Sequence, residues 1–191
     1  MKNYSIKFAV IFASAYALSA SAQDDSLAES RSVAVALIQQ LGAQLKKEMA
    51  AGGADAAINV CTKIAPELAT KFSLETGWRV TRVSLKARNP LIGTPDAWEQ
   101  QALKNFDARA AAGDAVDKLE HSEIVDEPNG RYFRYVKALP VQALCLACHG
   151  GTEQISESVK SALLRIYPHD RAIGYLPGQV RGAISIKRPT P

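Results

Sequence analysis

The most constraining feature of this 191-residue chain is one pentapeptide, Cys145-Leu-Ala-Cys148-His149. Two thiols three positions apart can each add to one vinyl group of the same porphyrin, and the adjacent imidazole then lies under the iron as its proximal ligand. The spacing therefore predicts a C-x-x-C-H attachment site for one covalent haem c. A fold that accepts this group must leave a large apolar space beside the motif.

The same cysteines have two other interpretations. A zinc site would need a second pair of ligands at finger or ribbon spacing, whereas the chain has only one further cysteine, Cys61. A thioredoxin-like redox pair would need a βαβ setting, which the flanking segments do not suggest. Haem attachment is therefore the interpretation that we favour.

The first 22 residues have the pattern of a secretory signal peptide. Lys2 and Lys7 form a short positive region, residues 8–18 are apolar, and Ala20-Ser21-Ala22 is an A-x-A cleavage site. The apolar stretch is too short for a stable membrane span, although an uncleaved anchor is the alternative. Because c-type haem is attached outside the cytoplasm, export and the pentapeptide support each other.

We therefore expect a periplasmic protein with a signal peptide over residues 1–22 and a single domain over residues 23–191. No later stretch is apolar for long enough to cross a bilayer, so no stable membrane insertion is expected after cleavage. The net charge of +4 falls to about +2 without the leader, and no basic run indicates nucleic-acid binding. Nothing resembles a Ser/His/Asp set, a P-loop or a paired-carboxylate site, so an electron carrier or sensor is favoured over an enzyme.

Apolar periodicity predicts two helices in the N-terminal part of the mature chain. Residues 34–49 carry apolar side chains at helical spacing, and Gly52-Gly53 should break this helix. A second helix begins near Asp55, places Cys61 on its apolar stripe and ends at Gly77. Pro66 lacks the backbone donor for the carbonyl of residue 62, so a kink is expected just after Cys61.

The remainder of the chain alternates strand and helix patterns. Strands are predicted over residues 78–85, 117–125, 131–139 and 180–187, and helices over residues 95–112, with Thr94 as N-cap, and 157–166. The segment Glu127-Pro128-Asn129-Gly130 indicates the turn between the second and third strands. Helices followed by an antiparallel sheet that further helices interrupt are typical of the α+β class.

Several spaced motifs together carry a family resemblance. They are Cys61-Thr-Lys-Ile-Ala-Pro66, Arg82-Val-Ser-Leu-Lys-Ala-Arg88-Asn89-Pro90, Pro95-Asp-Ala-Trp98-Glu99, the pentapeptide with Gly150, and Gly174-Tyr175 followed by Gly178-Gln-Val-Arg-Gly182. Over nearly the whole mature chain this order resembles the exported mono-haem c-type domain with a PAS-like fold, the Tll-type haem domain once catalogued as a domain of unknown function. The resemblance implies a twisted antiparallel sheet flanked by helices, a long N-terminal helical hairpin and haem against the sheet. It also implies that a cysteine thiolate from the second helix, here Cys61, is the sixth iron ligand.

From the residues alone, the sixth ligand stays open among Cys61, Met49, His121 and His169. Met49 continues an apolar row that core packing explains, His121 falls in a charged strand, and His169 lies in a loop near the motif. Position alone favours an inert buried role for Cys61. The odd cysteine count in an oxidising compartment and the family pattern favour ligation instead.

Arginine side chains are candidates for pairing with the haem propionates, because the guanidinium fork matches a carboxylate. The candidates are Arg82, Arg88, Arg134 and Arg181, and we select Arg88 for its Asn-Pro neighbour. Aromatic residues that line the pocket or pack in the core are Trp98, Phe133 and Tyr135.

The expected function is that of a periplasmic mono-haem c-type cytochrome-like protein that passes single electrons to a redox partner protein. With His149 and Cys61 both bound, the iron would be six-coordinate, low-spin and of low potential, because an anionic thiolate stabilises ferric iron. The alternative is a sensor of redox state or of a diatomic gas, which ligand exchange would admit. A haem enzyme ranks third, because it needs an open coordination position from the start.

Overall fold

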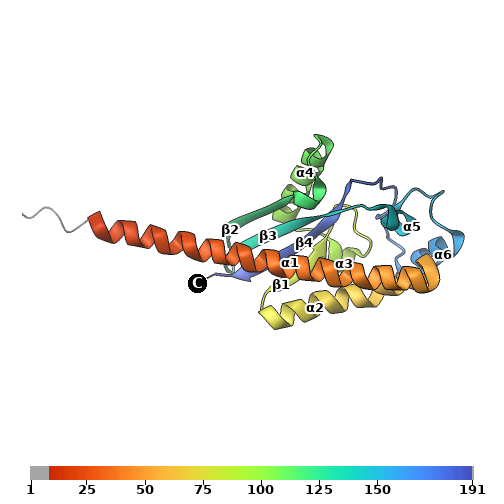
Figure 1. Ribbon diagram of the computed structural model, residues 1–191, viewed down its shortest axis with the longest axis horizontal. Coiled ribbons are helices and arrows are strands. Elements are labelled where there is room, and N and C mark those ends of the chain that lie inside the picture. The colour runs from red at the N-terminus through yellow and green to blue at the C-terminus, as the bar shows by residue number, and fades with distance from the viewer. Residues whose placement is uncertain (1–8, 191) are drawn as a thin grey trace, which may run out of the picture.

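The computed structural model describes the backbone of residues 9–190 and the side chains of residues 24–190 (Figure 1). Residues 1–8 of the expected signal peptide lie outside the described residues, and residues 9–22 are helical. No helix in the described part is long and apolar enough to cross a membrane. Cleavage after residue 22 and the single domain over residues 23–191 stay predictions.

A long helical hairpin forms the N-terminal part of the chain. Helix α1 (Ala9–Asn59) is interrupted at the Gly52-Gly53 pair, whose backbone angles are not helical. A π-helical turn over Val60–Ile64 follows and leads directly into α2 (Ala65–Thr76). Gly77 ends α2 in the left-handed conformation, with φ of 72°. The break and the end of this hairpin confirm the sequence prediction, and Figure 1 shows its two arms side by side.

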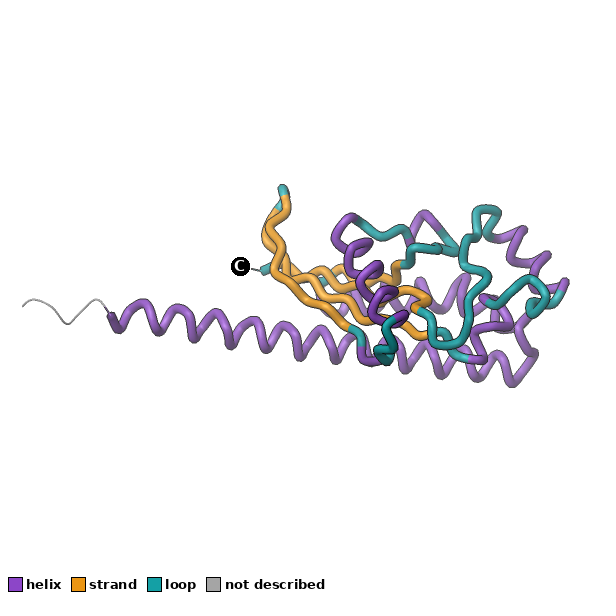
Figure 2. The backbone as a smooth tube through the Cα atoms, turned by 90° about the horizontal axis from the view of Figure 1, so that it is seen from above, coloured by secondary structure: helices purple, strands orange, loops and turns teal. Residues whose placement is uncertain are grey.

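Four strands form one antiparallel sheet in the order β1-β4-β3-β2. They are β1 (Arg79–Val83), β2 (Glu120–Glu127), β3 (Gly130–Pro140) and β4 (Val180–Pro189). β2 and β3 form the predicted hairpin, and the last strand, β4, lies between β1 and β3 (Figure 1). Figure 2 shows the strands gathered into one sheet beside the long N-terminal helix. The chain is therefore an α+β protein with a PAS-like antiparallel sheet flanked by helices, as predicted.

Helices cover both faces of the sheet. One face packs on α1 and α2 through a cluster of Ala34, Leu37, Phe72, Val80, Phe133, Tyr135, Ile184 and Ile186. The other packs on α4 (Ala97–Ala111) through Val83, Ala102, Leu103, Phe106, Val116, Leu119, Val136, Ala138, Val180 and Ala183. Successive strand residues point to opposite faces, so this packing fixes the face on which each strand side chain lies.

Short helices fill the connections between the strands and the longer helices. These short helices are α3 (Pro90–Gly93), α5 (Leu146–His149) and α6 (Glu157–Ile166), with 3-10 turns at Val116–Lys118 and Ala143–Cys145.

Some details of these connections differ from the sequence prediction. Thr94 does not cap α4: Asp96 does, in a capping box with Glu99. The stretch before Glu120 is a 3-10 turn rather than strand, and Asn89 caps the short helix α3, for which no helix was predicted.

A buried ionic cluster fixes α4 to its face of the sheet. Arg134 on β3 is 2% exposed and pairs with Asp96 at 2.7 Å, Glu127 at 2.8 Å and Glu99 at 3.4 Å. Glu99 is fully buried and also accepts a hydrogen bond from Ser185 Oγ at 2.6 Å. Arg134 and Glu99, the two members that are almost completely buried, are thereby each matched by an opposite charge, so neither is desolvated alone.

Replacement of Glu99 by Ala should destabilise the protein by about 3–5 kcal/mol, because it leaves the Arg134 cation buried with one partner fewer. Urea unfolding of the exported protein measures this loss. Lys104→Ala, at an exposed position of the same helix, is the control and should change the free energy of unfolding by about 0.5 kcal/mol or less. Equal unfolding midpoints for the two variants would contradict the role assigned to the cluster.

Candidate functional site

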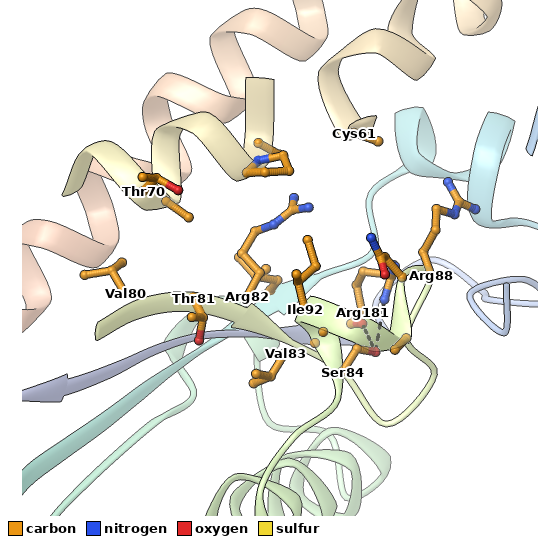
Figure 3. Close-up of a pocket in the computed structure, with 18 of the residues that line it drawn as sticks. Cys61, Thr70, Val80, Thr81, Arg82, Val83, Ser84, Arg88, Ile92 and Arg181 are labelled. Carbon is orange, nitrogen blue, oxygen red and sulfur yellow. Dashed lines mark hydrogen bonds between the residues drawn. The ribbon is translucent and has the colours of Figure 1, made fainter. Parts of the chain in front are cut away.

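A cavity of about 410 Å³ lies between α2, with its preceding π-helical turn, and the end of the sheet where β1 and β4 meet (Figure 3). Its volume falls within the range of about 300–1,000 Å³ that is common for small-molecule and cofactor sites. Apolar lining comes from Ala65, Pro66, Ala69, Leu74, Val80, Ile92 and Leu139, and polar lining includes Cys61, Arg82, Arg88, His149, Tyr167 and Arg181. Two of the predicted iron ligands, Cys61 and His149, therefore face one cavity.

Cys61 reaches this cavity from the π-helical turn. Pro66 has no N–H to donate to the carbonyl of residue 62, and the N–H of Ala65 donates to the carbonyl of Val60, five residues back. The predicted irregularity at Pro66 is thus present, as a π-helical turn that contains Cys61. Such turns are frequent at functional sites. Tyr167, beyond α6, donates from its hydroxyl to the Cys61 carbonyl at 3.4 Å.

His149 is held in one orientation by a backbone carbonyl. Its Nδ1 lies 2.7 Å from the carbonyl oxygen of Ala172. Burial, reinforced by the guanidiniums of Arg181 and Arg88, lowers the pKa of His149 well below its ordinary value, so the ring is neutral. A neutral ring that donates from Nδ1 keeps its lone pair on Nε2. The Nε group of Arg181 donates to that atom at 3.3 Å.

The loop that carries Ala172 is itself fixed to the motif. Tyr175 N donates to the His149 carbonyl at 2.9 Å, and Gly174 N donates to the Gly150 carbonyl at 2.8 Å. Asp170 accepts from Ala172 N at 2.7 Å through one carboxylate oxygen. The His149 ring is thereby oriented by a short segment that is anchored at both of its ends.

Arg88 connects this loop to the motif. Its Nε donates to Asp170 at 2.9 Å, and its Nη2 donates to the Cys148 carbonyl and, at 3.4 Å, to the Ala172 carbonyl. The side chain is 7% exposed, and its Nη1 is buried without a hydrogen-bond partner among the described residues. The residue selected from the sequence therefore does lie in the cavity, with one donor group unused.

Arg181 occupies the centre of the site because β4 approaches β1 closely at this point. Gly182 has φ of 157°, and a Cβ there would lie 2.3 Å from the carbonyl oxygen of Val83. This approach brings Arg181 next to Ser84, to which its Nη1 donates at 3.0 Å. Arg82, from β1, extends into the cavity beside it (Figure 3).

Cys145 and Cys148, the two cysteines of the motif, lie next to His149 in the chain but do not line the cavity. Cys148 packs in a cluster with Ile58 and residues of α6, and Cys145 packs beside Tyr175. Burial, together with the nearby Cys61, raises the pKa of Cys148 to about 11. Within the described residues no disulfide links Cys61, Cys145 and Cys148, and each of the three is half-buried.

The remaining candidate ligands lie elsewhere. Met49 is half-buried outside the cavity, His169 is exposed, and His121 is exposed and stacks on Trp98 with ring centroids 5.4 Å apart. Arg134 lies on the opposite face of the sheet, and the aromatic candidates Trp98, Phe133 and Tyr135 pack in or against the core clusters. Within residues 24–190, no group of three or more His, Cys, Asp or Glu side chains lies together as potential metal ligands.

Sequence reasoning missed the contact that orients His149. The acceptor is the main-chain carbonyl of Ala172, and a small apolar residue gives no indication of this role. Asp170, two residues before it, was the available signal, because aspartate commonly accepts from the backbone two residues ahead.

The fold and the site define an α+β domain in which a C-x-x-C-H turn is fixed against an antiparallel sheet and shares a cavity with a distant cysteine. The model of the Tll0287-like family matches residues 15–189, so the chain belongs to this family, as the sequence motifs indicated. Among solved structures, the chain is similar to the cyanobacterial haem protein Tll0287, with a TM-score of 0.64 and 28% identity over 85% of this chain and 96% of that one. The search of curated proteins finds no match.

Asp170→Ala should loosen the loop that orients His149. Amide hydrogen exchange at Ala172 should accelerate about tenfold or more, since a hydrogen bond to a charged group is worth about 1.5–3 kcal/mol. His169→Ala, at the exposed neighbouring position, is the matched control and should leave this rate unchanged. Unaltered exchange in the Asp170 variant would show that the loop is held without the carboxylate.

Proposed function

We propose that this chain binds one haem c covalently, through thioethers at Cys145 and Cys148, with His149 as the proximal iron ligand. The observation that carries the proposal is that His149, from the attachment motif, and Cys61, from a distant helix, line the same cavity. The solved relative is a haem protein, which supports the cofactor class. Iron held by the porphyrin would supply a one-electron ferric–ferrous couple.

The residues fit this cofactor on three observations. The neutral His149 presents an Nε2 lone pair, the state that metal coordination requires. The cavity is apolar along α2, as a porphyrin face requires, and it contains the unused Nη1 of Arg88. One change is needed, because Arg181 donates to Nε2 and must release that atom to a metal.

We propose Cys61 as the sixth ligand. It is the cysteine outside the motif, and it lines the cavity that His149 lines, whereas Met49, His121 and His169 do not. A thiolate is anionic and favours ferric iron, so the potential is low. A saturated iron suits transfer of single electrons, and the signal-peptide pattern supports export to the periplasm, with a redox partner protein there.

A second candidate function is sensing of redox state or of a diatomic gas. The observation in its favour is that Cys61 lies in a π-helical turn, whose hydrogen bonding is less regular than that of the helices on either side. A ligand on such a turn can move without unfolding a long helix. Carbon monoxide and the ferrous protein separate the two functions: slow or absent binding supports electron transfer, and rapid binding supports sensing.

Double replacement Cys145→Ser with Cys148→Ser should abolish covalent attachment. The mass of the intact exported protein, measured after denaturation, should then lack the porphyrin adduct, because neither thioether can form. Cys61→Ser keeps both motif cysteines and should retain the adduct. A wild-type protein without any adduct would refute the proposed function.

Cys61→Ala should change the ferric optical spectrum away from that of the six-coordinate, low-spin iron expected for wild type. It should also raise the midpoint potential of the haem, because it removes the anionic ligand. The axial ligand sets haem potentials over about 0.8 V, so the change should exceed any effect of a surface charge. His169→Ala, which alters an exposed candidate ligand, should leave spectrum and potential unchanged. Identical optical titrations of wild type and the Cys61 variant would exclude this cysteine as the ligand.

A further inference from the structure

The cavity carries an excess of positive charge. Three guanidiniums line it, from Arg82, Arg88 and Arg181, and the described lining residues include no aspartate or glutamate. One carboxylate, that of Asp170, pairs with Arg88. Asp170 therefore matches one of these three charges, and the cavity keeps an excess of two positive charges.

The hydrogen-bonding groups of these arginines are used unequally. Arg181 is occupied, because it donates to Ser84, to the Lys86 carbonyl and to His149. Arg88 uses Nε and Nη2 but not Nη1. Arg82 has no hydrogen bond or ion pair with any residue in the described part of the chain, and burial lowers its pKa below the ordinary value.

Arg134, on the other face of the sheet, is a buried arginine whose charge is matched by carboxylates of the protein itself. On the α4 face, both terminal nitrogens of Arg134 are paired with carboxylates at 2.7 and 2.8 Å. Arg82 lies on the opposite face, two residues after Val80 on the same strand, and has no such partner. Arg82 is partly exposed, and its guanidinium lines the cavity without a carboxylate partner among the described residues. The difference points to an anionic partner that the polypeptide does not supply.

We propose that Arg82, together with Nη1 of Arg88, binds two carboxylates of one ligand, the propionates of the haem, inside the cavity. The inference rests on the proposed haem site. Haem brings two carboxylates, whose charge matches the net excess of two positive charges in the cavity. Arg82 offers a planar fork of donors that suits bidentate pairing with a carboxylate.

This arrangement has an electrochemical consequence. When an external reductant supplies one electron to ferric iron, the net charge of the site falls by one. A nearby guanidinium stabilises the more negative, reduced state. Loss of Arg82 should therefore lower the midpoint potential, and a propionate that has lost its partner should take up a proton more easily.

The test uses Arg82→Gln in the intact exported holoprotein, with Arg165→Gln as the control. Arg165 is an exposed arginine on α6, so its replacement removes the same charge from the surface. Both variants should carry the covalent adduct, since neither alters the motif. The potential should fall in the Arg82 variant and should become pH-dependent between about pH 4 and 6, because a carboxyl group titrates near pH 4 in water and partial burial raises that pKa. The control should match wild type.

Equal potentials in the two variants, with haem attached in both, would overturn the role of Arg82 and leave the haem proposal intact. Absence of haem from wild type would instead refute the haem proposal. If the Arg82→Gln variant does not accumulate, Arg82→Lys replaces it. Lysine keeps the positive charge but lacks the planar pair of guanidinium donors, so the midpoint potential should fall less than with glutamine.

Two measurements on the wild-type holoprotein complete the test without any variant. Redox-difference infrared spectra at pH 5 should show no protonated carboxylic acid from the propionates, and such a band would overturn the proposal. Added succinate should leave the potential unchanged. A concentration-dependent shift would assign the two cations to a free dicarboxylate instead.

Discussion

The hydrogen bond between His149 Nδ1 and the Ala172 carbonyl is the interaction on which the site depends. It fixes the tautomer and the direction of the imidazole, and it does so from a loop that is bonded to the motif backbone at Gly150 and His149. Arg88 and Asp170 then stabilise the loop. Without this contact the direction of the Nε2 lone pair would be less well fixed, and the orientation of His149 relative to Cys61 across the cavity would vary.

The two faces of the sheet differ in whether their arginines are paired with carboxylates of the protein. On the α4 face, the cations and carboxylates around Arg134 and Glu99 compensate each other, so that face serves stability. On the α1–α2 face, Arg82 has no internal counter-charge. Arg82 is partly exposed and lines the cavity, so the internal pairing that stabilises the α4 face has no counterpart at this position.

The sequence predicts the elements better than it predicts the site. α6 spans the predicted residues 157–166, and Gly77 ends α2 as expected, because local capping and periodicity determine both. The face of a strand arginine depends on register, which pairs Arg82 with Ile184 and Arg134 with Lys187, and no local pattern fixes that register. Arg88, selected from the sequence as a propionate partner, lines the cavity, and its role there stays a prediction. Its hydrogen bonds to main-chain carbonyls could not be predicted, because the acceptors are not side chains.

The position of Cys61 follows from a local conflict in the chain. Pro66 cannot continue the hydrogen-bond ladder of a regular helix, and the wider π-helical turn over Val60–Ile64 accommodates it while keeping the hairpin continuous. Cys61 therefore sits on an element that is constrained at both ends but irregular in its middle. Its carbonyl is also held by Tyr167, which ties the turn to the segment after α6. A side chain placed in this way is directed at the cavity yet can shift by local rearrangement. Under the proposed function, electron transfer and ligand exchange would therefore differ in how firmly this one turn is held.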